Sequence, residues 1–276
     1  MEVKRDKKKK TKNTKKRSKK SFGLFITLLI VLLLLCFMKF IPSLASYKVD
    51  TRIDKLKTFT EEHTDLDVAG WLKVQGTNID YPILSTFDNI EYAEDGIQYL
   101  WENGDLSQLN RINYILGHNV MNLSSNPLIT NKDHVRFEQL LSFTYPKFVE
   151  KNKYVQLTIG EEEYVFKIFS VSYPSANAKS FYNDNYKDNE DVKQLIDESL
   201  ENSIFDFDID VNENDTIISL ITCTRMFGLS DKRNFVVDAR LVREGESTRN
   251  YKVTESKKFS QVKEKMKGDT SKNEEI

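Results

Sequence analysis

One almost wholly apolar run, from Phe22 to Met38, constrains this chain most, because so long an apolar segment has to be removed from water. Taken as residues 21–41, it holds about 20 residues, enough at ~1.5 Å per residue for a helix to cross ~30 Å of hydrocarbon. Positions 1–20 hold twelve Lys and Arg residues against two acidic residues. This excess of positive charge indicates that residues 1–20 lie in the cytoplasm. The pattern predicts a single-pass membrane anchor with everything after Pro42 outside the cell.

Two other interpretations of this N-terminal region stay open. One is a cleaved signal peptide, since Ser43-Leu44-Ala45 resembles a cleavage site, although the apolar region of a signal peptide usually has only ~7–15 residues. The other is a basic tail that binds nucleic acid, which is the weaker alternative because the basic block adjoins an apolar run. We therefore expect a membrane partner through the apolar helix and no nucleic-acid partner.

From Trp71 onward the apolar residues fall in short or alternating runs separated by turn residues, which is typical of a β-domain with many short strands. No internal repeat of a solenoid or propeller period is found. The expected helices are an amphipathic helix within Tyr47–Glu62 and two later helices at Phe137–Thr144 and Glu190–Ser203. The expected strands are Ala69–Val74, Tyr81–Leu84, Asn113–Leu116, Tyr154–Ile159, Glu163–Tyr173, Asp215–Cys223 and Asn234–Val242.

The last segment, from about Gly245 to Ile276, is polar and cannot bury much apolar surface. Such a composition does not offset the entropy lost on ordering, so disorder or a tail associated with the cell wall is expected. Before Ile276, its few apolar residues are Tyr251, Val253, Phe259, Val262 and Met266.

The chain has two cysteines, and Cys36 lies inside the apolar run. Cys223 is therefore the only cysteine of the exported part, and it is either an inert buried thiol or a reactive one. It ends the mainly apolar strand 217–222, as expected for a strand buried on both faces in a small barrel. If this strand and the next form an antiparallel hairpin, Cys223 and Arg233 become neighbours in space.

A thiol with a pKa near ~8.5 needs a neighbouring imidazole or cation to become an effective nucleophile. The chain has three histidines: His63 precedes the domain, His134 lies in a charged stretch, and His118 follows the apolar run Tyr114–Gly117. Catalytic groups are often placed where a strand opens into a loop. His118 is thus the candidate partner of Cys223, and a structural histidine is the alternative.

Four ordered segments resemble the sortase family, and the resemblance extends over about residues 67–243. YILGHNV (114–120) resembles the sortase histidine motif, SLITCTRMF (219–227) the cysteine motif, and RNFVVDARLV (233–242) the arginine strand. GWLKVQGTNIDYPILSTFDNIEYAE (70–94) resembles the opening pattern of class B sortases. The resemblance implies a mainly β fold, a sortase-type closed β-barrel with an N-terminal helix and a helix inserted between the sixth and seventh strands.

The resemblance also implies a cysteine transpeptidase that acts outside the cell of a Gram-positive bacterium. Cys223 would attack the Thr carbonyl of a sorting signal in a secreted protein, and His118 would protonate the departing amine. An arginine would stabilise the tetrahedral oxyanion. An amine of peptidoglycan, or a lysine of a pilin, would then resolve the thioester. The chemistry requires no metal or organic cofactor.

The arginine strand departs from the family pattern. Aligning the end of this strand with the family places Asn234, not Arg233, where the arginine is expected, and strand alternation puts these two residues on opposite faces. A bulge near the start of the strand would bring Arg233 to the face where the arginine is expected. We expect Arg233 to be the catalytic arginine, with Arg225 as the alternative. Ile221 stands where the family usually has serine.

Five residues are candidate substrate contacts. Thr222 and Asn119 adjoin the nucleophile and the histidine, and Tyr173, Phe181 and Tyr182 precede or enter the insertion that carries the predicted helix. A plain cysteine protease and a catalytically silent, membrane-tethered binding module are the alternatives to a transpeptidase.

The expected organisation has five parts. They are a basic cytoplasmic tail (1–20), a transmembrane anchor (21–41), a helical linker (42–66), the catalytic domain (67–245) and a polar tail expected to be disordered (246–276).

Overall fold

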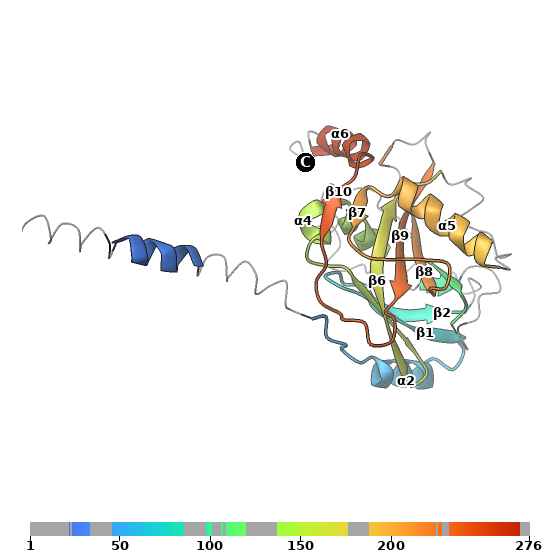
Figure 1. Cartoon of the computed structure of the whole chain (residues 1–276). Helices are drawn as coiled ribbons and strands as arrows, with labels where there is room; N and C mark the ends of the chain where they lie inside the picture. Colours follow the sequence, from blue (N-terminus) through green and yellow to red (C-terminus); the bar gives the residue numbers. More distant parts are fainter. Residues whose placement is uncertain are drawn as a thin grey trace, which may run out of the picture. The chain divides into compact units, whose positions relative to one another are not determined.

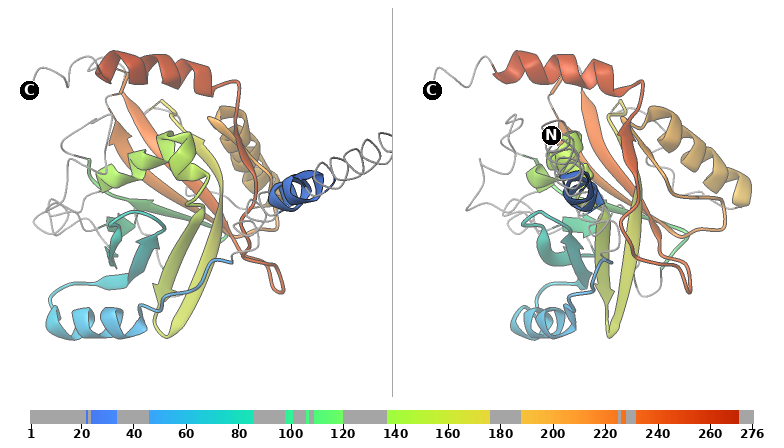
Figure 2. Two further views of the ribbon diagram at one scale, coloured as in Figure 1. Left: turned by 90° about the vertical axis from the view of Figure 1, so that its left-hand side faces the viewer. Right: turned by 60° about the vertical axis from the view of Figure 1, so that its left-hand side comes forward.

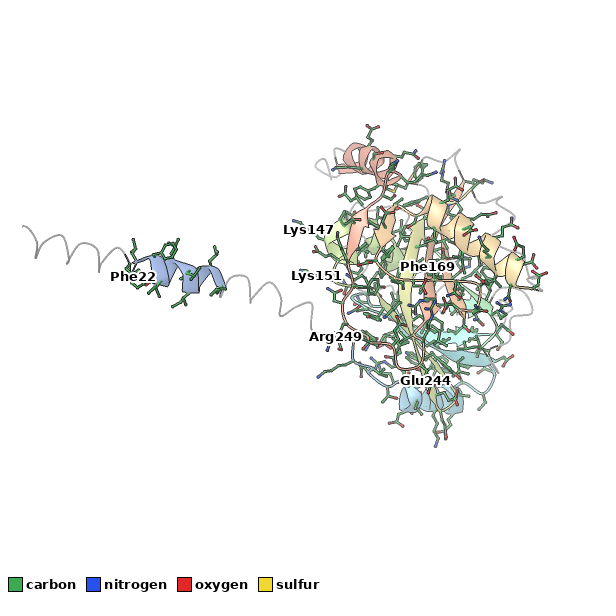
Figure 3. All side chains as sticks on the ribbon, in the orientation of Figure 1. Phe22, Lys147, Lys151, Phe169, Glu244 and Arg249 are labelled. Atoms are coloured by element: carbon green, nitrogen blue, oxygen red, sulfur yellow. The ribbon has the colours of Figure 1, made fainter. Side chains whose placement is uncertain are left out.

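The structure is a computed structural model. The chain forms two compact units, Met1–Ser46 and Tyr47–Ile276. In the first unit, residues 22 and 24–33 are helical, and their apolar side chains, such as Phe22, are exposed (Figure 3). Among the described residues, no helix is both long and apolar enough to cross a membrane. The residues described are 22, 24–33, 46–85, 98–100, 106, 109–119, 137–175, 188–224, 226–227 and 232–270.

In the second unit, eight strands close into a barrel in the order β1-β2-β3-β4-β8-β9-β6-β5 (Figure 1). The pairs β2–β3 and β4–β8 are parallel, and the others are antiparallel. Their bounds are β1 Val68–Val74, β2 Asp80–Leu84, β3 Gln98–Leu100, β4 Ile112–Leu116, β5 Tyr154–Ile159, β6 Glu162–Ser172, β8 Ile217–Thr224 and β9 Arg233–Leu241. The expected mainly β barrel is thus confirmed.

The remaining elements lie outside the barrel sheet. Each of the three expected helices is present, although the first begins only at Ile53 and the second is a 3-10 helix. The expectations missed three strands of three residues each, β3, β7 and β10. The outer elements are α2 Ile53–Glu62, η1 Phe137–Thr144, α4 Pro146–Val149, α5 Asn189–Asn202, β7 Phe205–Phe207, β10 Val253–Glu255 and α6 Phe259–Thr270.

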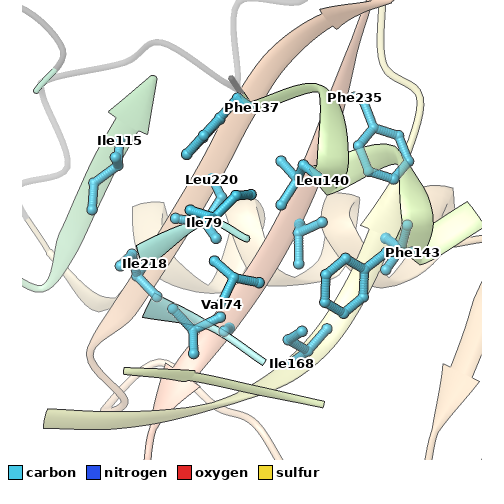
Figure 4. Packing of buried hydrophobic residues seen from close by; sticks show 14 of the residues in the cluster. Val74, Ile79, Ile115, Phe137, Leu140, Phe143, Ile168, Ile218, Leu220 and Phe235 are labelled. Atoms are coloured by element: carbon cyan, nitrogen blue, oxygen red, sulfur yellow. The ribbon is translucent and has the colours of Figure 1, made fainter. Parts of the chain in front are cut away.

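Strand alternation separates an inner from an outer face of the barrel. Ile218 and Leu220 of β8 and Phe235 of β9 belong to the main hydrophobic core, together with η1, which contributes Phe137 and Phe143 (Figure 4). Burying an apolar side chain of this size stabilises the fold by about 1.5–3 kcal/mol. The cysteine strand β8 is therefore held from inside by a packed core.

Helix α5 covers the outer face between the sixth and seventh barrel strands, β6 and β8, as expected (Figure 2). Asp188 caps its start, because its side chain accepts hydrogen bonds from the backbone N–H groups of Glu190 and Asp191. Val192 and Ile196 of the helix pack on Phe169 of β6 and on Ile217 of β8. The outer face of β8 is thus buried over this part of its length.

The prediction that residues 246–276 are disordered is wrong for the described part, which extends to residue 270. Strand β10 pairs with β7, and the Tyr251 hydroxyl donates to the backbone oxygens of Lys153 and Ile168. Phe259 and Val262 of α6 join the main core. The physical reason is that the few apolar residues of this segment are placed where they can pack on the main core. Glu246 also pairs with the buried guanidinium of Arg240 at 2.7 Å.

A carboxyl group, that of Asp238, lies fully buried on the outer face of β9. It accepts a 2.7 Å hydrogen bond from Ser219 Oγ on β8. Burial raises the pKa of Asp238 from 3.8 to about 6, because a charge loses its hydration there, although the Ser219 hydrogen bond lowers it. The fold therefore binds a proton at this site more tightly than the unfolded chain does.

We predict that Asp238→Asn stabilises the protein at pH 8. The stabilisation that protonated Asp238 contributes is complete below the unfolded pKa near 4 and is lost as pH rises through 6, at a cost of up to about 3 kcal/mol. Urea unfolding of both proteins at pH 4, 6 and 8 measures this, and the variant should show a flatter profile. Asp208→Asn, at an exposed position, is the control. Lower stability of Asp238→Asn at pH 8 would contradict the prediction.

Candidate functional site

Cys223 lies near the end of β8, where the strand emerges from the packed part of the barrel. It is exposed, whereas its neighbours Thr222 and Thr224 are buried on the other face of the strand. Of the two possibilities left open by the sequence, an inert buried thiol and a reactive thiol, the exposure of Cys223 excludes a buried one. The thiol is reachable from solvent.

The segment that carries His118 runs beside the segment that carries Cys223. Parallel pairing of β4 with β8 sets Leu116 opposite Ile221, and the backbone N–H of Gly117 donates to the Ile221 oxygen at 3.1 Å. Two side-chain hydrogen bonds continue this pairing beyond the end of β4. Thr222 Oγ1 donates to the Gly117 oxygen at 2.7 Å, and Asn119 Nδ2 donates to the Cys223 oxygen at 2.9 Å. The expected proximity of the histidine and cysteine segments is therefore present in the fold.

Gly117 lets the chain approach η1 closely just before His118. A Cβ atom added at position 117 would lie 2.5 Å from Cγ of Phe137, a ring that is fully buried in the core. Any residue other than glycine would therefore displace either this ring or the backbone leading to His118. Sequence reasoning missed this contact, for which the glycine directly before the candidate histidine was the available signal.

Arg233 begins β9 and pairs with Thr224, so its side chain lies on the face opposite to that of Cys223. The β8–β9 register has no shift, so the bulge that would have brought it across is not present in this pair of strands. Its guanidinium lies 4.4 Å from the centroid of the Phe227 ring and donates to the Tyr173 oxygen at 3.2 Å. Arg233 thus links Phe227, which lies in the β8–β9 connection, to Tyr173, which follows β6.

Several other predicted site residues have structural roles or lie outside the described residues. Thr222 is 2 % exposed and Tyr173 6 %, and both side chains are engaged, the latter at 2.6 Å with Thr144 Oγ1. Among the described residues, no cluster of His, Cys, Asp and Glu could hold a metal ion. The residues outside the described part are His134, Phe181, Tyr182 and Arg225.

Comparison with known proteins decides the family. The family profile for the sortase domain matches residues 72–242, more than half of the chain. The chain belongs to the sortase family. Sortase B of Staphylococcus aureus (strain NCTC 8325 / PS 47) is 25% identical to this sortase over 191 residues, which are 66% of the chain and 73% of that relative.

Two solved structures share this fold. The X-ray structure of Clostridium perfringens sortase B is 27% identical, with a TM-score of 0.55 over 68% of this chain and 99% of that one. The Staphylococcus aureus sortase B-substrate complex is 21% identical, with a TM-score of 0.54 over 70% and 93% of the two chains. The expected class B is therefore confirmed, and this sortase is a sorting-signal transpeptidase of the cysteine type.

We predict that Gly117→Ala lowers the transpeptidation rate of this sortase at least tenfold, because the new Cβ collides with the Phe137 ring and moves the His118 segment. Initial rates on a cleavable peptide measure the effect. The double variant Gly117→Ala/Phe137→Leu removes the ring atoms that collide, and it should recover part of the rate. Full activity of Gly117→Ala would show that the Phe137 ring can move without disturbing the site.

Proposed function

We propose that Cys223 is the nucleophile of this sortase and that His118 is its acid–base partner. The observation that carries the proposal is the exposed thiol at the end of β8, bound through the Asn119 and Thr222 hydrogen bonds to the segment that contains His118. Most of the surrounding barrel is packed, so these two side chains come from rigid strand ends. Preorganisation of this kind favours a chemical step because little has to move.

In the proposed reaction the Cys223 thiolate attacks the carbonyl carbon of the Thr in a sorting signal of a secreted protein. The C–N bond breaks, His118 gives its proton to the departing amine, and a thioester remains on Cys223. An acceptor amine then attacks the thioester, loses a proton to His118, and releases Cys223 as thiolate. The product is an amide, and water in place of the amine gives the acid.

The acceptor and the site of action are part of the same proposal. We infer that the acceptor is an amine of peptidoglycan or a lysine of a pilin, and that residues 21–41 anchor the enzyme in the membrane with the catalytic domain outside. What supports the anchor is the apolar composition of residues 21–41 next to the basic residues 1–20. A cell-surface role is common to the family.

We expect Cys223→Ala to abolish cleavage and His118→Ala to lower it by about 10²–10⁴-fold. The experiment incubates the full chain in detergent with a peptide library and identifies the bond cut by mass spectrometry. His63→Ala is the matched control, because His63 contacts Phe59, whose helix lies outside the barrel, and it should leave the rate unchanged. Retained turnover of Cys223→Ala would disprove the mechanism.

A second prediction separates a transpeptidase from a plain cysteine protease and from a silent binding module. Adding a nucleophilic amine such as triglycine should convert the peptide product from acid to amide, while peptide consumption stays the same or rises. A plain protease would form acid alone. If the protein were a catalytically silent binding module, iodoacetamide would alkylate Cys223 slowly, and His118→Ala would not change this rate.

A further inference from the structure

We propose that one basic face of the second unit, at the point where the chain enters it, binds the anionic lipid headgroups of the membrane that anchors the enzyme. The inference rests on the proposed anchor at residues 21–41 and adds a second contact with the same bilayer. The basic face is defined by five exposed side chains, those of Lys48, Lys147, Lys151, Arg249 and Lys252.

The charge of the basic face is opposite to that of the unit that carries it. Residues 47–276 hold 28 Lys and Arg residues against 40 Asp and Glu residues, a net charge of −12. The three segments that form the face are residues 47–48, 147–154 and 248–252, and together they hold six basic residues and one acidic residue, Glu150. A positive face on an otherwise acidic unit is attracted to an anionic surface, whereas the rest of the unit is repelled by it.

Hydrogen bonds and aromatic contacts hold the three segments together. The backbone N–H of Tyr47 donates to the Thr248 oxygen at 2.7 Å, and the Tyr47 ring stacks on Tyr154 with centroids 4.8 Å apart. The Tyr154 hydroxyl donates to the Arg249 oxygen at 2.7 Å, and the Tyr251 ring lies edge-on to Tyr154 with centroids 6.0 Å apart. The backbone that carries the basic side chains is therefore fixed before any partner binds.

The five charges of the basic face are available to an outside partner. Figure 3 shows Lys147, Lys151 and Arg249 along one edge of the domain. Helix α4, which carries Lys147, also contacts β10, which directly follows Lys252. Within the part of the chain that the structure describes, no ion pair involves any of the five side chains. A lipid headgroup therefore does not have to displace an internal carboxylate.

The length of the connecting chain keeps this face near the bilayer. If residues 21–41 span the membrane, residues 42–46 separate the anchor from Tyr47, and a chain of that length reaches about 20 Å when fully extended. Charges on a protein and on a membrane attract each other over a Debye length of about 8 Å at physiological ionic strength. A short tether raises the effective concentration of the surface, so several weak contacts are enough for binding.

A bilayer suits this face better than a soluble anion does. Its phosphate groups form one extended layer, which can meet charges that come from three separate segments at the same time. The anchor also holds this layer beside the face, whereas a soluble anion has to bind from dilute solution. The second unit would then rest with one side on the membrane instead of turning freely on its linker.

The test places the full chain in nanodiscs of phosphatidylcholine alone and of phosphatidylcholine mixed equally with phosphatidylglycerol. An uncharged N-hydroxysuccinimide acetate labels exposed amines, and mass spectrometry gives the labelling rates of Lys48 and Lys252. Both rates should fall about threefold or more in the anionic discs, because anionic headgroups cover these amines and favour their protonated form, and high salt should restore the rates. Lys193 on α5, which lies apart from α4, is the internal reference and should not change (Figure 1).

The variant Lys147→Gln/Lys151→Gln removes two charges from the basic face and leaves both reporter amines in place. In the anionic discs, it should return their labelling to about the rate in neutral discs. The matched control Lys55→Gln/Lys57→Gln removes the same charge from α2, and it should keep the slow labelling. All four positions are exposed, so these substitutions leave the core intact.

The proposal is overturned if the two reporter amines label equally fast in both kinds of disc, or if Lys147→Gln/Lys151→Gln keeps the slow labelling. It is also overturned if soluble polyphosphate at the same phosphate concentration protects the two amines in neutral discs as well as the anionic lipid does, because the partner would then be a polymer. A full chain that does not co-purify with either kind of disc would instead disprove the proposed anchor, so the two failures are distinguishable.

Discussion

The parallel pairing of β4 with β8 is the interaction on which the site depends. It joins segments about a hundred residues apart and sets Leu116 opposite Ile221, so that the chain continues to His118 alongside Cys223. Hydrogen bonds of Gly117, Thr222 and Asn119 extend the pairing past the end of the strand. Because the barrel is closed, neither strand is an edge, and their relative position cannot slide without breaking ladders on both sides.

Much of the architecture could be predicted because alternation of apolar residues reports directly on strands with one buried face. The long strands and the two later helices were found to within a few residues, whereas the first helix begins only at Ile53. Strands β3, β7 and β10 were not, since three residues carry too little pattern. The ordered tail was missed for a related reason: Phe259 and Val262 pack on the main core, and only the three-dimensional fold brings that core to them.

The candidate site, too, could be predicted from the sequence only in part. Cys223 and the hairpin that follows it could be predicted from local pattern, and so could the conflict between Arg233 and Asn234, because alternation along one strand is a local property. The inward direction of Thr222 and the contact of Gly117 with Phe137 could not. Both depend on which strands become neighbours, which a single sequence does not specify. Thr222, a candidate substrate contact, thus also joins the two segments through its hydroxyl group.

The order in which the core is completed has a consequence for biosynthesis. Ribosomes make proteins from the N-terminus, so Phe259 and Val262 leave the exit tunnel after the barrel strands, yet they belong to the main core. Until they arrive, the barrel lacks two apolar side chains and the β7–β10 pairing. The nascent barrel can therefore reach its final packing only after α6 has been synthesised, which delays the appearance of active enzyme until that point.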